Sequence, residues 1–211
     1  MKRFQFSTYD YDELMRCGDA FKGDIVENAD VFGAMFDNRQ WTDYVLDWFT
    51  AAAAYNLVTR AHEQQASAPW QSRFTGRRLG TLAPAARSPS EFLLDLTHVY
   101  VAPMPAVIQQ GKFGWVHRVR LGLESEWGHA TSPTNNLERV LYDASKLAAV
   151  RAEAKVMVFG STAPGNHDDI VENLRRLRAA SADAAPWLWI DIPWNQDQCT
   201  GTWEPNFGVE R

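Results

Sequence analysis

Cysteine is scarce in this chain, and long apolar runs are missing. Its 211 residues include two cysteines, Cys17 and Cys199, far apart and outside any Cys-x-x-Cys pattern. A disulfide framework or a structural zinc site is therefore not expected, and a reducing compartment fits. The first residues lack the apolar run of a signal peptide, and no segment approaches the length of about 18 apolar residues that spans a membrane. We expect a cytoplasmic protein that does not bind membranes.

Motifs of several enzyme classes are absent as well. The sequence contains neither Gly-x-x-x-x-Gly-Lys-Ser/Thr nor Gly-x-Gly-x-x-Gly, so a nucleotide-binding loop is not supported. The five histidines show no His-x-x-x-His spacing, which argues against zinc hydrolase chemistry. Ser161 lies in Gly-Ser-Thr and not in Gly-x-Ser-x-Gly, so a serine hydrolase would lack its nucleophile elbow.

The composition is that of a globular protein with a sizeable core. Hydrophobic residues make up 45% of the chain and charged residues 22%. The length suits one domain, so residues 1–211 are interpreted as a single domain. The nine tryptophans are expected in the core or in the wall of a pocket, because a large ring removes much apolar area from water.

The net charge of −5 is unevenly distributed. Residues 66–120 carry 7 Lys and Arg against 2 Asp and Glu, whereas the segments on both sides are acidic. Within this stretch, residues 66–90 are rich in proline, glycine and arginine, which predicts a long surface loop. The side chains expected to contact a nucleic-acid backbone are Arg73, Arg77, Arg78 and Arg87, together with Trp70 and Phe74. The alternative is a solvated, arginine-rich loop without a ligand.

The first 65 residues are expected to be helical. Asp10 followed by Glu13 resembles a capping box at the start of a helix. Thr42 is placed to cap a second helix, which runs to about His62 and carries apolar residues at helical spacing.

The apolar period then changes and predicts an α/β core over residues 91–194. Strands are expected at 91–101, 117–127, 154–161 and 187–194. Helices are expected at about 136–153 and 167–180, capped by Asn135 and Asn166. Residues 195–211 are interpreted as a loosely ordered tail. The expected architecture is a mixed central sheet flanked by helices, with a helical N-terminal region.

The candidate chemistry lies in a group of carboxylates. Glu124 and Glu126 are two apart on a predicted strand, so both leave the same face. Because paired carboxylates repel, they favour a cation such as Mg²⁺, which prefers oxygen ligands. Asp95, near the middle of the preceding predicted strand, can supply a third oxygen. On the next helix Asp143 and Lys146 are three apart and share a face, so the lysine can reach these carboxylates.

The simpler explanation is that the two glutamates form the solvent face of a half-exposed strand. Lys146 would then be an ordinary residue of a helix surface. His129, just past the strand, can line the site, but it is interpreted as an ordinary loop residue.

Three segments resemble the core of the PD-(D/E)XK nuclease superfamily, which has the restriction-endonuclease-like fold. They are EFLLDL (91–96), LGLESEWG (121–128) and DASKLAAVRAEAKVMVF (143–159). The similarity is closest to a group of bacterial members with an acidic strand residue, a Glu-x-Glu-Trp strand and an Asp-x-x-Lys-Leu helix. The resemblance covers about residues 42–194.

The family pattern places an acid on one strand and (D/E)-x-K on the next. By that pattern Asp95 matches the first acid and Glu124 the second. Glu126 occupies the lysine position, which is a departure from the pattern. In some branches the lysine is displaced to the following helix, and Lys146 is placed to fill that role.

The resemblance implies a nuclease that uses Mg²⁺, or Mn²⁺ as a substitute, with DNA preferred over RNA. Asp95 and Glu124 would bind the metal, and Glu126 would assist or bind a second ion. Lys146 would orient water or stabilise charge, and Asp143 would hold Lys146 in position. Nucleic acid is the expected partner, and a homodimer or a protein partner is left open.

Two rival functions remain. One is a non-catalytic protein of the same fold that binds a protein partner or nucleic acid in regulation or defence. The acidity of the chain and the glutamate at position 126 favour it. The other is a sugar- or nucleotide-processing hydrolase with Glu124 and Glu126 as acid and base. Residues two apart on one strand approach a substrate from the same side, which fits that chemistry poorly.

Overall fold

The chain forms four long helices and a seven-stranded sheet within the part described by its computed structural model. The described residues are 4–28, 32, 37–64, 71–76, 87–88, 94–102, 115–127, 132–162, 164–181, 183–193 and 205–211. The helices are α1 (Tyr11–Glu27), α3 (Asn38–Gln64), α4 (Pro133–Ala149) and α5 (Pro164–Ala180).

The sheet is mixed, as the sequence predicts. Its strands lie in the order β2-β1-β3-β4-β5-β6-β7. Their bounds are β1 (Gln71–Gly76), β2 (Arg87–Ser88), β3 (Leu96–Ala102), β4 (Trp115–Glu126), β5 (Ala152–Phe159), β6 (Trp187–Asp191) and β7 (Asn206–Glu210). β4, β5 and β6 run parallel, whereas β1, β3 and β4 are antiparallel neighbours. β7 pairs antiparallel with β6 at one edge.

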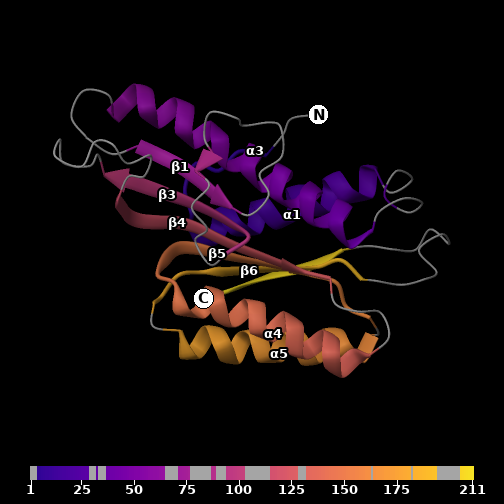
Figure 1. Cartoon of the computed structure of the whole chain (residues 1–211). Helices are drawn as coiled ribbons and strands as arrows, with labels where there is room; N and C mark the ends of the chain where they lie inside the picture. The colour runs from indigo at the N-terminus through magenta and orange to yellow at the C-terminus, as the bar shows by residue number, and fades with distance from the viewer. Residues whose placement is uncertain are drawn as a thin grey trace.

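Helices cover both faces of this sheet (Figure 1). α1 and α3 lie on one face, where their apolar side chains form a cluster with residues of β3 to β6 such as Leu121 and Leu123. α4 and α5 lie side by side on the other face, where Val140, Leu147 and Ile170 pack against strand residues. The prediction of a mixed sheet flanked by helices is confirmed.

The start of the first helix also follows the sequence. The Asp10 side chain accepts a hydrogen bond from the Glu13 N–H, so Asp10 is the N-cap of α1. The Glu13 carboxylate accepts from the N–H and hydroxyl of Ser7. The second predicted helix is present as α3, but its predicted start was wrong, because α3 begins at Asn38 and Thr42 lies inside it. The Thr42 hydroxyl donates instead to the Asn38 carbonyl.

The two later helices begin earlier than predicted. Ser132 caps α4 by accepting from the Asn135 N–H, and Pro133 occupies the first helical position. A proline tolerates that position because its missing N–H would have no helical partner there. In α5, which begins at Pro164, Asn166 lies within the first turn and not at the cap.

Two segments interpreted as irregular contain strands. Residues 66–90, predicted to be a loop, hold β1 and β2, and β1 pairs along its whole length with β3. Within the predicted tail 195–211, residues 206–210 form β7 beside β6. In both cases hydrogen bonds to a distant strand outweigh a local composition that favours turns.

The strand predicted at 91–101 starts late. β3 begins at Leu96, so Asp95 directly precedes the strand and does not lie near its middle. The pairing of Leu96 with Leu123 makes Asp95 and Glu124 the next positions along the two antiparallel chains. The later start thus still brings the two acids to neighbouring positions.

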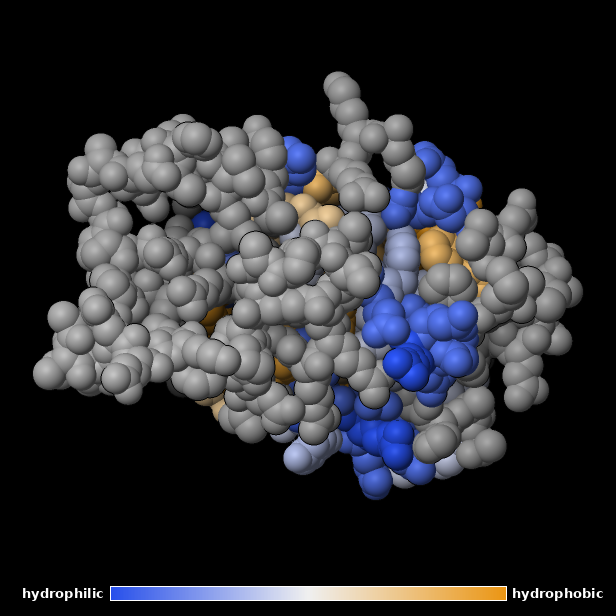
Figure 2. Space-filling view, turned by 45° about the horizontal axis from the view of Figure 1, so that its top comes forward, coloured by the Kyte–Doolittle hydropathy of each residue, from blue (hydrophilic) through white to orange (hydrophobic). Residues whose placement is uncertain are grey.

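Large apolar side chains are seldom exposed among the residues that the structure describes. On the face seen in Figure 2, hydrophilic residues gather in one region of the described surface. Among the described residues, the large hydrophobic side chains that are exposed are Val26 and Tyr142. None of the described helices has the length and apolar character of a membrane span.

Candidate functional site

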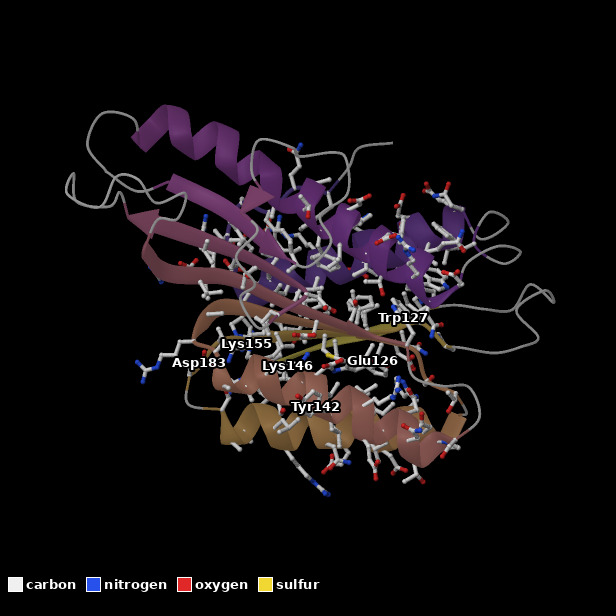
Figure 3. The ribbon with its side chains drawn as sticks, viewed as in Figure 1. Glu126, Trp127, Tyr142, Lys146, Lys155 and Asp183 are labelled. Atoms are coloured by element: carbon white, nitrogen blue, oxygen red, sulfur yellow. The ribbon has the colours of Figure 1, made fainter. Side chains whose placement is uncertain are left out.

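An acidic pocket lies between the end of β4 and one face of α4. Its volume is about 650 Å³. Its lining residues are Asp95, Glu124, Ser125, Glu126, Asn135, Glu138, Arg139, Tyr142, Asp143 and Lys146. Figure 3 shows Lys146 and Tyr142 on α4 and Glu126 on the neighbouring strand. Every acid and the lysine predicted from the sequence to form a site are therefore brought to one pocket.

Side chains at alternate positions of β4 form one side of the pocket. Glu124 and Glu126 both reach it, whereas Leu121 and Leu123 belong to the core on the opposite face of the sheet. The two glutamates share a face because side chains two apart on a strand point the same way. Gly122 lets other groups pack closely over β4, since a Cβ there would lie 2.8 Å from Leu94 Cδ1 and 3.4 Å from a Leu147 methyl group.

Residues on one face of α4 form the other side of the pocket. Glu138, Arg139, Tyr142, Asp143 and Lys146 recur at intervals of three or four residues and therefore share one face of the helix. The rest of α4 is anchored by buried apolar residues that pack on the sheet.

A lysine connects the helix to the strand. Lys146 Nζ donates to Glu124 Oε2 at 3.3 Å and lies 2.5 Å from Asp143 Oδ1. Desolvation lowers the pKa of Lys146, but the hydrogen bond that its ammonium donates to Asp143 and the charge of Glu124 outweigh this effect, so the pKa is raised. Lys146 is therefore a protonated cation held between two carboxyl groups.

Glu124 is a buried carboxyl group, and one of its oxygens accepts no hydrogen bond from the described residues. Its side chain is 1% exposed. Its Oε1 is buried, and no described residue donates a hydrogen bond to it. Desolvation and the nearby charge of Asp95 raise the pKa of Glu124 to about 9, although Lys146 lowers it. One lysine is thus insufficient to keep this group ionised near neutral pH, and a further cation would favour its charged form.

Asp95 is positioned by the strand next to it. Its Oδ2 accepts from the Ser125 N–H at 2.9 Å and from the Ser125 hydroxyl at 3.0 Å. Burial raises the pKa of Asp95, while these two hydrogen bonds and Lys146 lower it. Ser125 therefore orients the Asp95 carboxylate and favours its charged form.

Glu126 has a different environment. Its Oε1 lies 3.6 Å from Arg139 Nη1, and the Arg139 side chain is 46% exposed. Counting all side chains that line the pocket, five carboxylic acids face two cationic groups. The excess of acid repels a bare phosphate and attracts a divalent cation.

The oxygen ligands of the pocket suit a Mg²⁺ ion that keeps several of its waters better than an ion coordinated by protein groups alone. In the part of the chain that the structure describes, no three His, Cys, Asp or Glu side chains are grouped to hold a metal. Mg²⁺, however, keeps several waters and is bound through one or two carboxylates plus substrate phosphates. Asp95 and Glu124 provide two carboxylates, and the Glu124 Oε1 without a donor is suited to a cation.

The arginines predicted to bind nucleic acid are not among the lining residues of this pocket. Arg73 lies in β1 and Arg87 in β2, and the structure describes only their backbone. Arg77, Arg78, Trp70 and His129 lie outside the described residues.

Sequence reasoning missed several lining residues. Ser125, which orients Asp95, carries no motif of its own, and only the strand pairing reveals it. The helical period was a usable signal for the others. Counting back from Lys146 by four, seven and eight residues gives Tyr142, Arg139 and Glu138.

Comparisons of this chain with models of protein families, with curated proteins and with solved structures found no match.

Proposed function

We propose that this protein is a metal-dependent nuclease that hydrolyses phosphodiester bonds, with DNA preferred over RNA. The observation that carries the proposal is the buried Glu124 carboxyl. One of its oxygens is paired with Lys146, and the other has no donor among the described residues. Asp95 lies beside it in the same open acidic pocket. A carboxyl group in this environment is suited to a divalent cation.

Asp95 and Glu124 would hold Mg²⁺, with Mn²⁺ as a substitute. When bound, the ion would polarise a phosphoryl oxygen and lower the pKa of a bound water. It would also compensate the excess of acidic groups, so that a phosphate can enter. Ser125 supports this role because it fixes the orientation of Asp95.

Lys146 would stabilise negative charge that develops on the phosphate or orient a water molecule. Its ammonium already lies beside Glu124, within the pocket, and Asp143 keeps it there. Preorganised cations of this kind stabilise a transition state without reorganising during the reaction. Glu126 would assist the metal or bind a second ion, in exchange for its contact with Arg139.

The order of these groups supports the resemblance to the PD-(D/E)XK superfamily. An acid beside one strand, a glutamate on the next and a lysine on the following helix meet at one pocket. We therefore propose a restriction-endonuclease-like core. The basic stretch with Arg73, Arg77, Arg78 and Arg87 would contact the phosphate backbone. The scarcity of cysteine favours a cytoplasmic location.

A cleavage assay tests the proposal. The purified chain is incubated with single-stranded and duplex DNA and RNA in the presence of Mg²⁺, Mn²⁺ or a chelator. We expect cleavage with either metal and none with the chelator. If no substrate is cut with Mn²⁺, or if cutting continues in the chelator, the proposal is wrong.

The non-catalytic alternative rests on two observations. Lys146 already neutralises part of the charge of Glu124, and no group of three potential metal ligands is found among the described residues. Lys146 and Glu124 would then form an ion pair that only stabilises the fold. The protein would bind a protein partner or nucleic acid without cleaving it. This alternative predicts that neither Mg²⁺ nor Mn²⁺ raises the melting temperature and that the parent protein never cleaves.

A further inference from the structure

Tyr142 presents an aromatic ring to solvent at the edge of the acidic pocket. The residue is 70% exposed and lines the pocket. The other exposed large hydrophobic side chain among the described residues is Val26, on α1, which covers the opposite face of the sheet. Figure 3 shows Tyr142 and Lys146 along the same helix.

Single exposed apolar residues are common and need no explanation by themselves. Tyr142 differs because of its neighbour. Lys146 Nζ lies 5.5 Å from the centroid of the Tyr142 ring, and the same amine is bonded to Glu124. The ring is therefore adjacent to the group that would face the scissile phosphate. A ligand whose phosphate is held near Lys146 would have its sugar and base within reach of Tyr142.

We infer that Tyr142 is a stacking platform for an unpaired nucleobase, so that the substrate is single-stranded at the bond to be cut. This inference rests on the proposed function for the position of the phosphate. Bases inside a duplex have both faces covered by their neighbours, so an exposed protein ring can stack only on an unpaired or terminal base. Aromatic side chains stack on any base, because every base has a π face.

The charge of the pocket strengthens the argument. Five acids face two cationic groups, so direct attraction of phosphate contributes little to affinity at this point. Stacking supplies affinity without positive charge, whereas phosphate contacts weaken as salt is added. An exposed ring beside an acidic, metal-dependent site therefore fits a substrate with a free base.

The experiment compares two ligands that differ only in their bases. Binding is measured by fluorescence anisotropy in Ca²⁺ with an oligothymidylate of about 12 nucleotides and with an abasic oligomer of equal length and charge. Tyr142→Ala removes the ring, whereas Tyr142→Phe keeps it. We expect Tyr142→Ala to weaken oligothymidylate binding by about 5- to 100-fold. Tyr142→Phe should bind like the parent, and neither variant should change binding of the abasic oligomer.

The inference is overturned if Tyr142→Ala binds oligothymidylate like the parent, or if it loses affinity equally for both oligomers. The inference is also overturned if the parent binds neither oligomer. The proposed function is scored separately, by cleavage. A parent that binds bases through Tyr142 but never cuts would contradict the nuclease and keep the stacking site. If the parent cuts but Tyr142→Ala has no base-dependent effect, the nuclease proposal stands and the stacking site is contradicted.

Discussion

Lys146 on α4 and Glu124 on β4 form an ion pair, with Lys146 Nζ 3.3 Å from Glu124 Oε2. The glutamate is 1% exposed and the lysine 25% exposed, so the pair extends from the interior to the pocket. A buried carboxylate with a single cationic partner is costly unless further groups compensate its charge.

Removing the lysine should affect catalysis more than binding. Lys146→Ala deletes a cation aimed at the pocket, and we expect the cleavage rate to fall by about 10²- to 10³-fold, as for removal of one transition-state stabiliser. Binding of DNA should remain, because the backbone contacts are proposed to lie elsewhere. Arg176→Ala is a suitable control, since Arg176 is 69% exposed and pairs with Glu172 on α5. If Lys146→Ala cuts at the parent rate, the lysine is only a structural partner of Glu124.

The stability of the metal-free protein should depend on pH through Glu124. Its pKa is raised from 4.5 to about 9 in the folded protein. The folded state therefore holds a proton that the unfolded state has lost, and stability falls as pH rises between these values. Burial of Asp95 acts in the same direction. We expect Glu124→Gln to flatten the decrease of melting temperature over this range, which differential scanning calorimetry measures.

Metal should oppose that loss of stability. Mg²⁺ binds the ionised carboxylate and displaces its proton, so the rise in melting temperature on adding Mg²⁺ should be larger near pH 8 than near pH 6. A rise of equal size at both pH values would mean that the ion binds away from Glu124.

Ser125 should tune metal affinity through Asp95. Ser125→Ala removes the hydroxyl that donates to Asp95 Oδ2 but keeps the backbone N–H. The pKa of Asp95 should rise further, and affinity for Mn²⁺ should fall by about 10-fold or more, as is typical for groups that orient a ligand. Ser145→Ala is the control, because the Ser145 hydroxyl donates to the Tyr142 carbonyl. Calorimetric titration that finds equal Mn²⁺ affinity in parent and Ser125→Ala would contradict this role.

Lys155, a buried lysine outside the pocket, should matter for stability alone. Lys155, 1% exposed, donates to Asp183 at 2.9 Å and to Ser181 at 3.2 Å, and neither Lys155 nor Asp183 lines the acidic pocket. Asp183→Ala should lower the free energy of unfolding by about 3 kcal/mol, because it leaves the buried Lys155 ammonium without its carboxylate partner. Adding Lys155→Met should recover part of that loss. Urea unfolding measures both, and cleavage per folded molecule should stay constant.

The candidate site was predictable where local periodicity determines it. Glu124 and Glu126 share a face because they are two apart on a strand, and Asp143 and Lys146 share one because they are three apart on a helix. The spacing also allowed the lysine of the helix to reach the carboxylates of the strand, and the resemblance to a known fold strengthened that expectation.

Features that depend on pairing between distant segments were not predictable. The position of Asp95 before β3, and its hydrogen bonds to Ser125, follow from the register between β3 and β4. β7 was not predicted, because it forms only by pairing with β6. Gly208 lies against the Trp189 ring, where a Cβ would come within 2.6 Å of it, so the fit of this strand is a property of its neighbour. Local composition does not record either relationship.

The most direct test of the account is metal-dependent cleavage by Glu124→Gln beside the parent protein. Glutamine keeps the size of the side chain but cannot carry the charge that would hold the ion, and it can be buried without ionisation. We expect the parent to cut DNA with Mn²⁺ and the folded variant to show no cleavage. Cleavage by Glu124→Gln at the parent rate would contradict the account, because Glu124 would then hold no essential metal and a contaminating nuclease would explain the activity.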